Sequence, residues 1–261
     1  MSHWYTNEGK PMHWIEGANG KQRDTTLRDA RKLNLFPSVT TILGTIDKPA
    51  LTGWKLKQVT EACFNDEAAW DMASYNDYHK SMMNDAFQDS TDARDRGSEI
   101  HDAIEDLVLD ESPMCAPDIE MIARHAWLAI CEDTGAGLHD FIPEATVCGD
   151  GYAGMIDLHN DEFLIDWKTK DIDDIKKKMA YPEQAMQLAA YDRALFKSTP
   201  IGSRPPSYRP RRCINVFIDR QEPGKLVIHE WKPEDISLAW QKFQLLVKYW
   251  QLDKGYKPEA L

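Results

Sequence analysis

The clearest pattern along the chain is a change of hydrophobic period in its middle third. In 98–109 the apolar residues recur every three or four positions, which predicts an amphipathic helix, and a similar stretch covers roughly 118–133. The segments 144–149, 152–159 and 162–170 instead combine β-branched and aromatic residues and are separated by turn residues. This change predicts three short strands that follow two helices.

The alternation of helices and strands continues to the C-terminus. A helix is predicted over 182–196, and the strands 213–220 and 225–231 are joined by the turn Gln-Glu-Pro-Gly. The last helix, 233–251, carries an apolar stripe that we assign to packing rather than to a ligand. The order predicts an α/β (α+β) fold in which helices flank a mixed central β-sheet.

The N-terminal third has a different character. Residues up to 36 are rich in turn residues and contain aromatic islands, which predicts a short hairpin. A helix-like stretch near 54–64 and a polar, Met- and Asp-rich region to about residue 93 follow. We expect 1–95 to be a hairpin and helical, arch-like extension and 96–261 to be the core, together forming one compact unit.

The charge of the chain is unevenly distributed. The formal net charge is −12, and residues 61–120 hold 17 acidic and 3 basic residues. The rest is close to neutral and contains two basic stretches, 21–57 with Lys55 and the loop 204–212 with Arg211. Each stretch fits either a solvated face or a contact with nucleic acid, so charge alone does not identify the partner.

Several classes of protein are disfavoured by simple features. No run of 18 apolar residues is present, so no membrane span is expected. The first residues lack a basic leader with an apolar core, and the five cysteines are scattered. We therefore expect a cytoplasmic location without a disulfide framework or an iron-sulfur cluster.

The segment Gly-Met-Ile-Asp-Leu-His-Asn-Asp-Glu-Phe-Leu-Ile-Asp-Trp-Lys carries the sharpest chemical signal. On a strand, Asp166 and Lys168 share one face while Trp167 points to the other. Asp157 ends the preceding strand and can come beside Asp166 across a tight turn. Two close carboxylates need a proton or a cation between them, and a hard divalent ion is the usual solution. The alternative is an edge-strand salt bridge.

Other polar residues have a bland and a chemical interpretation. His101 and Glu105 lie four apart on a helix, so His101 is either a half-buried metal ligand or a core histidine. Gln187 and Tyr191 lie four apart on an apolar helix and serve either backbone capping or substrate contact. Glu144 opens a strand and is either exposed or directed to the same edge of the sheet.

In this order the motifs Gly-x-x-x-His, strand-start Glu, Gly-x-Ile-Asp, Ile-Asp-Trp-Lys and Gln-x-x-x-Tyr resemble the PD-(D/E)XK nuclease superfamily, specifically its RecB-like exonuclease branch. With Phe-Pro-Ser-Val-Thr-Thr-Ile-Leu and Gly-Trp-Lys ahead of them, the chain is most similar to the mitochondrial genome maintenance exonucleases and their phage and bacterial relatives. The resemblance runs in patches from 36 to 250. The matching residues are Gly97, His101, Glu144, Gly154, Ile156, Asp157, Asp166, Trp167, Lys168, Gln187 and Tyr191.

The resemblance implies a restriction-endonuclease-like core and a DNA exonuclease that acts on single-stranded or frayed ends with one or two Mg²⁺ or Mn²⁺ ions. By this analogy Asp157, Asp166, Lys168 and Glu144 are catalytic. The implied metal ligands are His101, Asp157, Asp166 and the backbone carbonyl of Trp167.

The resemblance also implies a substrate path. Gln187 and Tyr191 would lie near the DNA, as would Ser38 and Thr40, and an arch poor in basic groups would use aromatic stacking, for example by Trp70. No mitochondrial targeting segment precedes the core, which favours a bacterial or phage setting and a role in DNA recombination, repair or degradation. Two alternatives stay open: a structure-specific endonuclease on the same core, and a DNA-binding or inhibitory module without catalysis.

Overall fold

The computed structural model describes residues 3–65, 75–137, 139–173, 179–198 and 207–259, and the predicted strands form its main sheet. The strand order is β5-β6-β7-β8-β9, and only β7 and β8 run parallel. Parallel neighbours need a long crossover connection, which here contains the helix α6. The bounds are β5 Ile142–Cys148, β6 Ala153–His159, β7 Phe163–Lys170, α6 Pro182–Ser198, β8 Arg212–Asp219 and β9 Leu226–Glu230.

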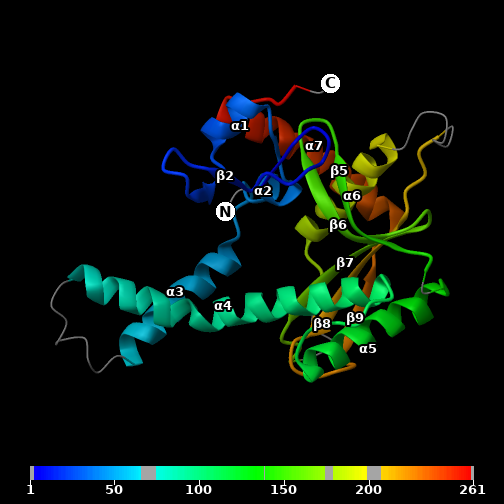
Figure 1. Cartoon of the computed structure of the whole chain (residues 1–261), viewed down its shortest axis with the longest axis horizontal. Coiled ribbons are helices and arrows are strands. Elements are labelled where there is room, and N and C mark those ends of the chain that lie inside the picture. Colours follow the sequence, from blue (N-terminus) through cyan, green and yellow to red (C-terminus); the bar gives the residue numbers. More distant parts are fainter. Residues whose placement is uncertain (1–2, 66–74, 138, 174–178, 199–206, 260–261) are drawn as a thin grey trace.

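Helices cover both faces of this sheet (Figure 1). On β7, Ile165 and Trp167 pack into a cluster with α4 (Tyr75–Val108) and α5 (Pro117–Thr134). Leu164, on the opposite face, packs with α6 and α7 (Pro233–Lys254). The alternation of side chains along a strand explains both contacts. The fold class is therefore confirmed as a mixed central sheet flanked by helices.

Local sequence sets the ends of two of the helices that flank the sheet. Both α5 and α7 begin with a proline, whose missing N–H costs nothing in the first turn. They end at Gly135 and Gly255, with φ of 67° and 54°, in the left-handed conformation that glycine adopts readily. The apolar stripe predicted on α7 is mostly buried, including Phe243 and Trp250. It is packing surface, as expected.

The N-terminal segments belong to the same body. The predicted hairpin is β2 paired with β3, and the shorter β1 pairs with β4. Trp4 is only 1% exposed and packs against Trp250 and Tyr256, near the end of the chain. The bounds are β1 Trp4–Tyr5, β2 Trp14–Glu16, β3 Gln22–Asp24, α1 Leu27–Leu33, β4 Phe36–Pro37 and α2 Val39–Leu43.

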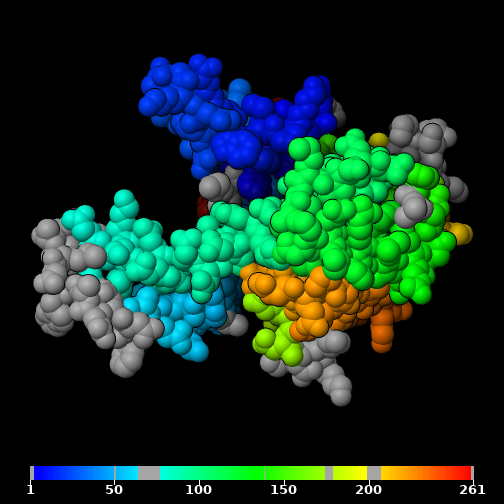
Figure 2. All heavy atoms as spheres, turned by 60° about the horizontal axis from the view of Figure 1, so that its bottom comes forward, coloured from blue at the N-terminus to red at the C-terminus, as the bar shows by residue number. Residues whose placement is uncertain are grey.

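A helical hairpin formed by α3 (Pro49–Asn65) and the first half of α4 projects from this body, as the cyan part of Figure 2 shows. The expected start of a helix at residue 98 is wrong, because α4 begins at Tyr75. Its first half is largely exposed and polar, so hydrophobic period could not reveal it. The expected boundary after residue 95 falls inside α4. None of the described helices combines the length and apolar character of a membrane span.

Candidate active site

The strands β6 and β7 part at the two aspartates of the predicted site. Pairing is present at Leu158 with Ile165 and at His159 with Leu164, and the same register would set Asp157 opposite Asp166. Ile156 and Leu158 would share a face in a regular strand, yet they pack into different clusters. The strand β6 thus turns at Asp157.

At this turn a side chain replaces a ladder hydrogen bond. The Trp167 N–H donates to Asp157 Oδ2 at 2.8 Å. Asp157 is half-buried and lies close enough to Asp166 that its charge helps to raise the pKa of Asp166. The sequence prediction that adjacent strands bring these two groups together agrees with this geometry.

Asp166 is the most buried acid of the group, with 2% of its surface exposed. Its Oδ2 accepts hydrogen bonds from Lys168 Nζ at 2.6 Å and from Asn215 Nδ2 at 2.7 Å. Its Oδ1 is buried and has no hydrogen-bond partner among the described residues. Burial raises the pKa of Asp166, the Lys168 ammonium opposes this, and the charge of Asp157 adds to it. One oxygen of a buried carboxylate is therefore left for an external partner.

Lys168 lies on the same face of β7 as Asp166, as predicted, and its side chain is 31% exposed. Burial disfavours its ammonium form, but the carboxylates of Asp166 and Asp157 outweigh this and raise the pKa of Lys168. The amine is therefore a cation near neutral pH. It is suited to hold charge on an oxygen or to orient water.

Glu144 joins the two aspartates from β5. The pairs Pro143 with Leu158 and Ala145 with Ile156 set Glu144 opposite Asp157. Its φ is 50°, a left-handed conformation that costs a residue with a Cβ roughly 1–2 kcal/mol. Burial, followed by the charges of Asp157, Glu105 and Asp102, raises the pKa of Glu144 to about 7. The exposed strand-start interpretation does not describe it.

The helix α4 brings His101 to the same place. A Cβ at Gly97 would lie 2.4 Å from Thr169 Oγ1, so this glycine lets α4 approach β7 directly beyond Lys168. His101, one turn later, is half-buried. It lies close enough that its charge opposes the rise in the pKa of Asp166 that burial causes. The glycine of the Gly-x-x-x-His motif thus has a packing role.

The predicted pair on α6, Gln187 and Tyr191, lies near the start of β6, where the ring of Tyr191 packs against Gly154. Gln187 Nε2 and Tyr191 Oη are 3.4 Å apart, and Tyr191 is 5% exposed. A Cβ at Gly154 would lie 2.5 Å from Tyr191 Cε1, so the motif glycine makes room for the ring. Burial and then the charge of Asp166 raise the pKa of Tyr191 well above its usual range. Tyr191 is therefore near Asp166.

The predicted N-terminal substrate residues divide into two kinds. Ser38 is 3% exposed, caps α2 by accepting from the Thr41 N–H, and bridges to Ala153 at the start of β6. Thr40 is exposed, with its hydroxyl 2.9 Å from that of Ser38. Lys55 is exposed on α3, in the projecting hairpin. Trp70, expected to stack on DNA, lies outside the described residues, as does Arg204 of the basic loop.

Arg211 is held by contacts within the protein. Its Nη1 donates to Asp192 at 2.9 Å and its Nε to the Asn160 carbonyl at 2.8 Å. The Arg211 side chain is 14% exposed and that of Asp192 is completely buried. The guanidinium expected to contact DNA is therefore engaged in a largely buried ion pair at the start of β8.

The predicted metal ligands do not form a ready-made cluster. Within the described ranges, no three His, Cys, Asp or Glu side chains converge closely enough to enclose an ion. The donor chemistry still suits a hard divalent cation, which is often held by one or two carboxylates with water completing its shell. The unpartnered buried Oδ1 of Asp166 fits such an ion. His101, Asp157 and Asp166 are the residues that would hold it.

Sequence reasoning missed Asn215 and Trp231. Asn215 is completely buried on β8, directly opposite Asp166, and it binds both Asp166 and the indole of Trp231. The available signal was one amide within the apolar strand segment 213–218, where an unsatisfied polar group would be costly.

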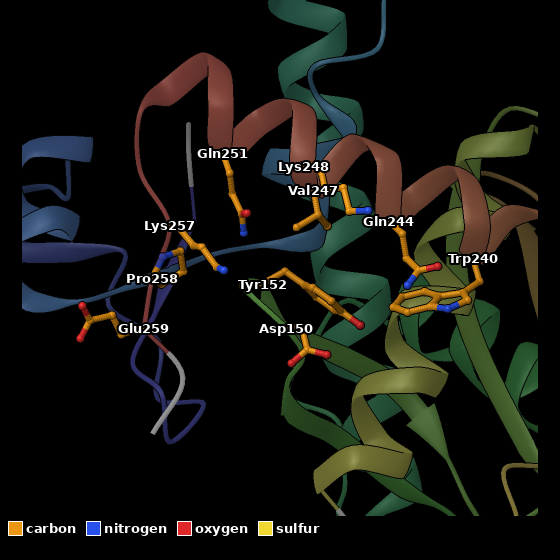
Figure 3. A pocket seen from close by; sticks show the side chains of 11 residues that line it. Asp150, Tyr152, Trp240, Gln244, Val247, Lys248, Gln251, Lys257, Pro258 and Glu259 are labelled. Atoms are coloured by element: carbon orange, nitrogen blue, oxygen red, sulfur yellow. The ribbon is translucent and has the colours of Figure 1, made fainter.

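A cavity of about 760 Å³ lies apart from these residues (Figure 3). Side chains of α7, including Trp240 and Gln251, face Tyr152 and the C-terminal segment across it. Its described lining contains none of the predicted site residues. The cavity is therefore separate from the carboxylate site.

Comparison with known proteins gives only partial likeness. No protein-family profile and no curated protein matches the chain. A structure from Eubacterium rectale, described as a candidate exonuclease, overlaps with a TM-score of 0.37 at 12% identity over 73% of this chain and 69% of the other. An alkaline exonuclease from Laribacter hongkongensis overlaps with a TM-score of 0.29 at 15% sequence identity, over 61% of this chain and 92% of the other. Overlaps of this size do not define a family, and the side chains at β6 and β7 therefore carry the functional conclusion.

Proposed function

We propose that this protein is a Mg²⁺- or Mn²⁺-dependent deoxyribonuclease that hydrolyses phosphodiester bonds from single-stranded or frayed DNA ends. The observation that carries the proposal is the hydrogen bonding of the Asp166 carboxylate. This buried carboxylate is held at Oδ2 by Lys168 and Asn215 and leaves a buried Oδ1 without a partner. Asp157 and Glu144 converge on the same place, where β6 and β7 part.

Each side chain has a role in this proposal. Asp157, Asp166 and His101 hold one or two divalent ions, with the backbone carbonyl of Trp167 as a further ligand implied by the resemblance. A bound ion polarises the phosphate and makes a water molecule more acidic. Lys168 orients that water or stabilises charge on a phosphate oxygen. Glu144 faces Asp157 from β5 and takes part in the same carboxylate group.

The substrate path is proposed along the start of β6. Ser38 bridges to Ala153, and Tyr191 lies against Gly154, so both flank the strand that ends in Asp157. DNA would pass beside Thr40 and Gln187, the neighbours of these two residues. Lys55 on the projecting α3 would contact the DNA further from the carboxylates. Three parts of the proposal come from the sequence resemblance. They are DNA as the substrate, attack at free ends, and a bacterial or phage pathway of recombination, repair or degradation.

Digestion of matched linear and circular single-stranded DNA with Mg²⁺ tests the proposal. An exonuclease needs an end, so we expect cleavage of the end-labelled linear strand and none of the circle. Cleavage of both would identify an endonuclease on the same core. Cleavage of neither, with retained binding, would identify a DNA-binding module and overturn the enzymatic proposal. The same reactions with EDTA are the control for metal dependence.

A further inference from the structure

A buried line of hydrogen bonds leads from Asp166 away from the proposed ion site. Asn215 on β8 is the register partner of Asp166 and is 0% exposed. Its Nδ2 donates to Asp166 Oδ2 at 2.7 Å, and its Oδ1 accepts from Trp231 Nε1 at 2.7 Å. Both ends of the amide are therefore occupied.

The chemistry of the two partners permits one orientation of this amide. The indole N–H of Trp231 only donates, and an ionised Asp166 carboxylate only accepts. A flipped Asn215 would set its carbonyl oxygen against a carboxylate oxygen and its NH₂ group against an N–H. Trp231 therefore fixes which end of Asn215 faces Asp166.

The consequence concerns the carboxylate plane of Asp166. Its Oδ2 is held from two sides, by Asn215 and by Lys168 at 2.6 Å, while Oδ1 has no described partner. Lys168 is partly exposed and ends a side chain with four rotatable carbon–carbon bonds, so by itself it would allow the carboxylate to rotate and present either oxygen. The second, rigid donor from the sheet removes that freedom.

We propose that Asn215 is a positioning residue, oriented by Trp231, which holds Asp166 with Oδ1 directed at the divalent ion. The inference rests on the proposed function, since it assigns a support to one of its metal ligands. Groups that orient metal ligands in this way are commonly worth about 10–100-fold in metal affinity or activity. In this proposal neither residue is itself a metal ligand.

Binding of Mn²⁺ to the full chain, measured by calorimetry without DNA, tests this directly. Asn215→Leu replaces the amide with an apolar group of similar size, and we expect Mn²⁺ to bind about tenfold or more weakly. Trp231→Phe keeps the aromatic packing but removes the N–H, so we expect a smaller weakening in the same direction. In the cleavage assay, both variants should need more Mn²⁺ for half-maximal rate while KM for DNA stays unchanged.

The control is Val216→Ala, which removes buried volume one residue away on the other face of β8. It should lower Tm and leave the Mn²⁺ affinity unchanged. A substitution that only destabilises the sheet is expected to give this result. Wild-type affinity in folded Asn215→Leu, or in folded Trp231→Phe if the first variant does not fold, would overturn the inference. If the wild-type chain binds Mn²⁺ but cleaves no DNA, and these variants bind Mn²⁺ more weakly than it does, the proposed function is rejected and the positioning role stands.

Discussion

Asp166→Asn and Lys168→Ala are each expected to lower the rate of DNA cleavage by about a thousandfold or more. A bound ion contributes several kcal/mol to stabilising the transition state, and about 4 kcal/mol corresponds to a thousandfold in rate. Asp166→Asn removes the ligand charge but keeps the shape of the side chain. Lys168→Ala removes the cation that lies 2.6 Å from Asp166. The measurement is initial rate on an end-labelled linear strand at saturating Mg²⁺.

Lys170→Ala is the matched control for this pair. Lys170 lies two residues further along β7 on the same face, over the ring of Phe217 at 5.1 Å. Its loss should leave the rate close to that of the wild type. Thermal melts should show that all three variants are folded. In Asp166→Asn the partly exposed ammonium of Lys168 can be solvated, and in Lys168→Ala the Asp166 carboxyl keeps the Asn215 donor and can take up a proton, because burial already raises its pKa. Substantial cleavage by folded Asp166→Asn or Lys168→Ala would refute the assignment of the site.

Arg211→Ala is expected to destabilise the fold by about 3–5 kcal/mol, the usual cost of removing one partner from a buried ion pair. Asp192 has no exposed surface and would keep only the hydroxyl of Tyr208 among its described side-chain partners. Burial already raises the pKa of Asp192, which shows how poorly its charge is solvated. The measurement is urea unfolding of the full chain.

Arg209→Ala is the comparison for this prediction. Arg209 is exposed and lies two residues earlier, so its loss should change stability by about 0.5 kcal/mol or less. If Arg211→Ala kept wild-type stability and weakened DNA binding instead, the interpretation from sequence would be right and the structural role would be rejected.

Hydrophobic period was sufficient to predict the sheet and the helices that pack on it. The β-meander, the final hairpin and the buried stripe of α7 follow from residues whose burial is regular, such as Leu164, Ile165 and Phe243. The shared face of Asp166 and Lys168 follows from the two-residue repeat of a strand. The turn between β6 and β7 then limits how far Asp157 can lie from them.

Features that depend on contacts between distant segments could not be predicted in this way. The first half of α4 is a polar helix with little apolar period, so its start was missed. The left-handed backbone of Glu144 arises where β5 meets the turn in β6. Arg211 finds Asp192, 19 positions earlier in the sequence, only because α6 packs beside β8.

Crystals of the full chain grown with saturating Mn²⁺ give the most direct test of a cation pocket between the two aspartate-bearing strands. We predict an anomalous difference peak bounded by Asp166 Oδ1 and the Asp157 carboxylate, with His101 at its side. Well-ordered side chains and no peak between Asp157 and Asp166 would contradict a metal-dependent nuclease built on this site.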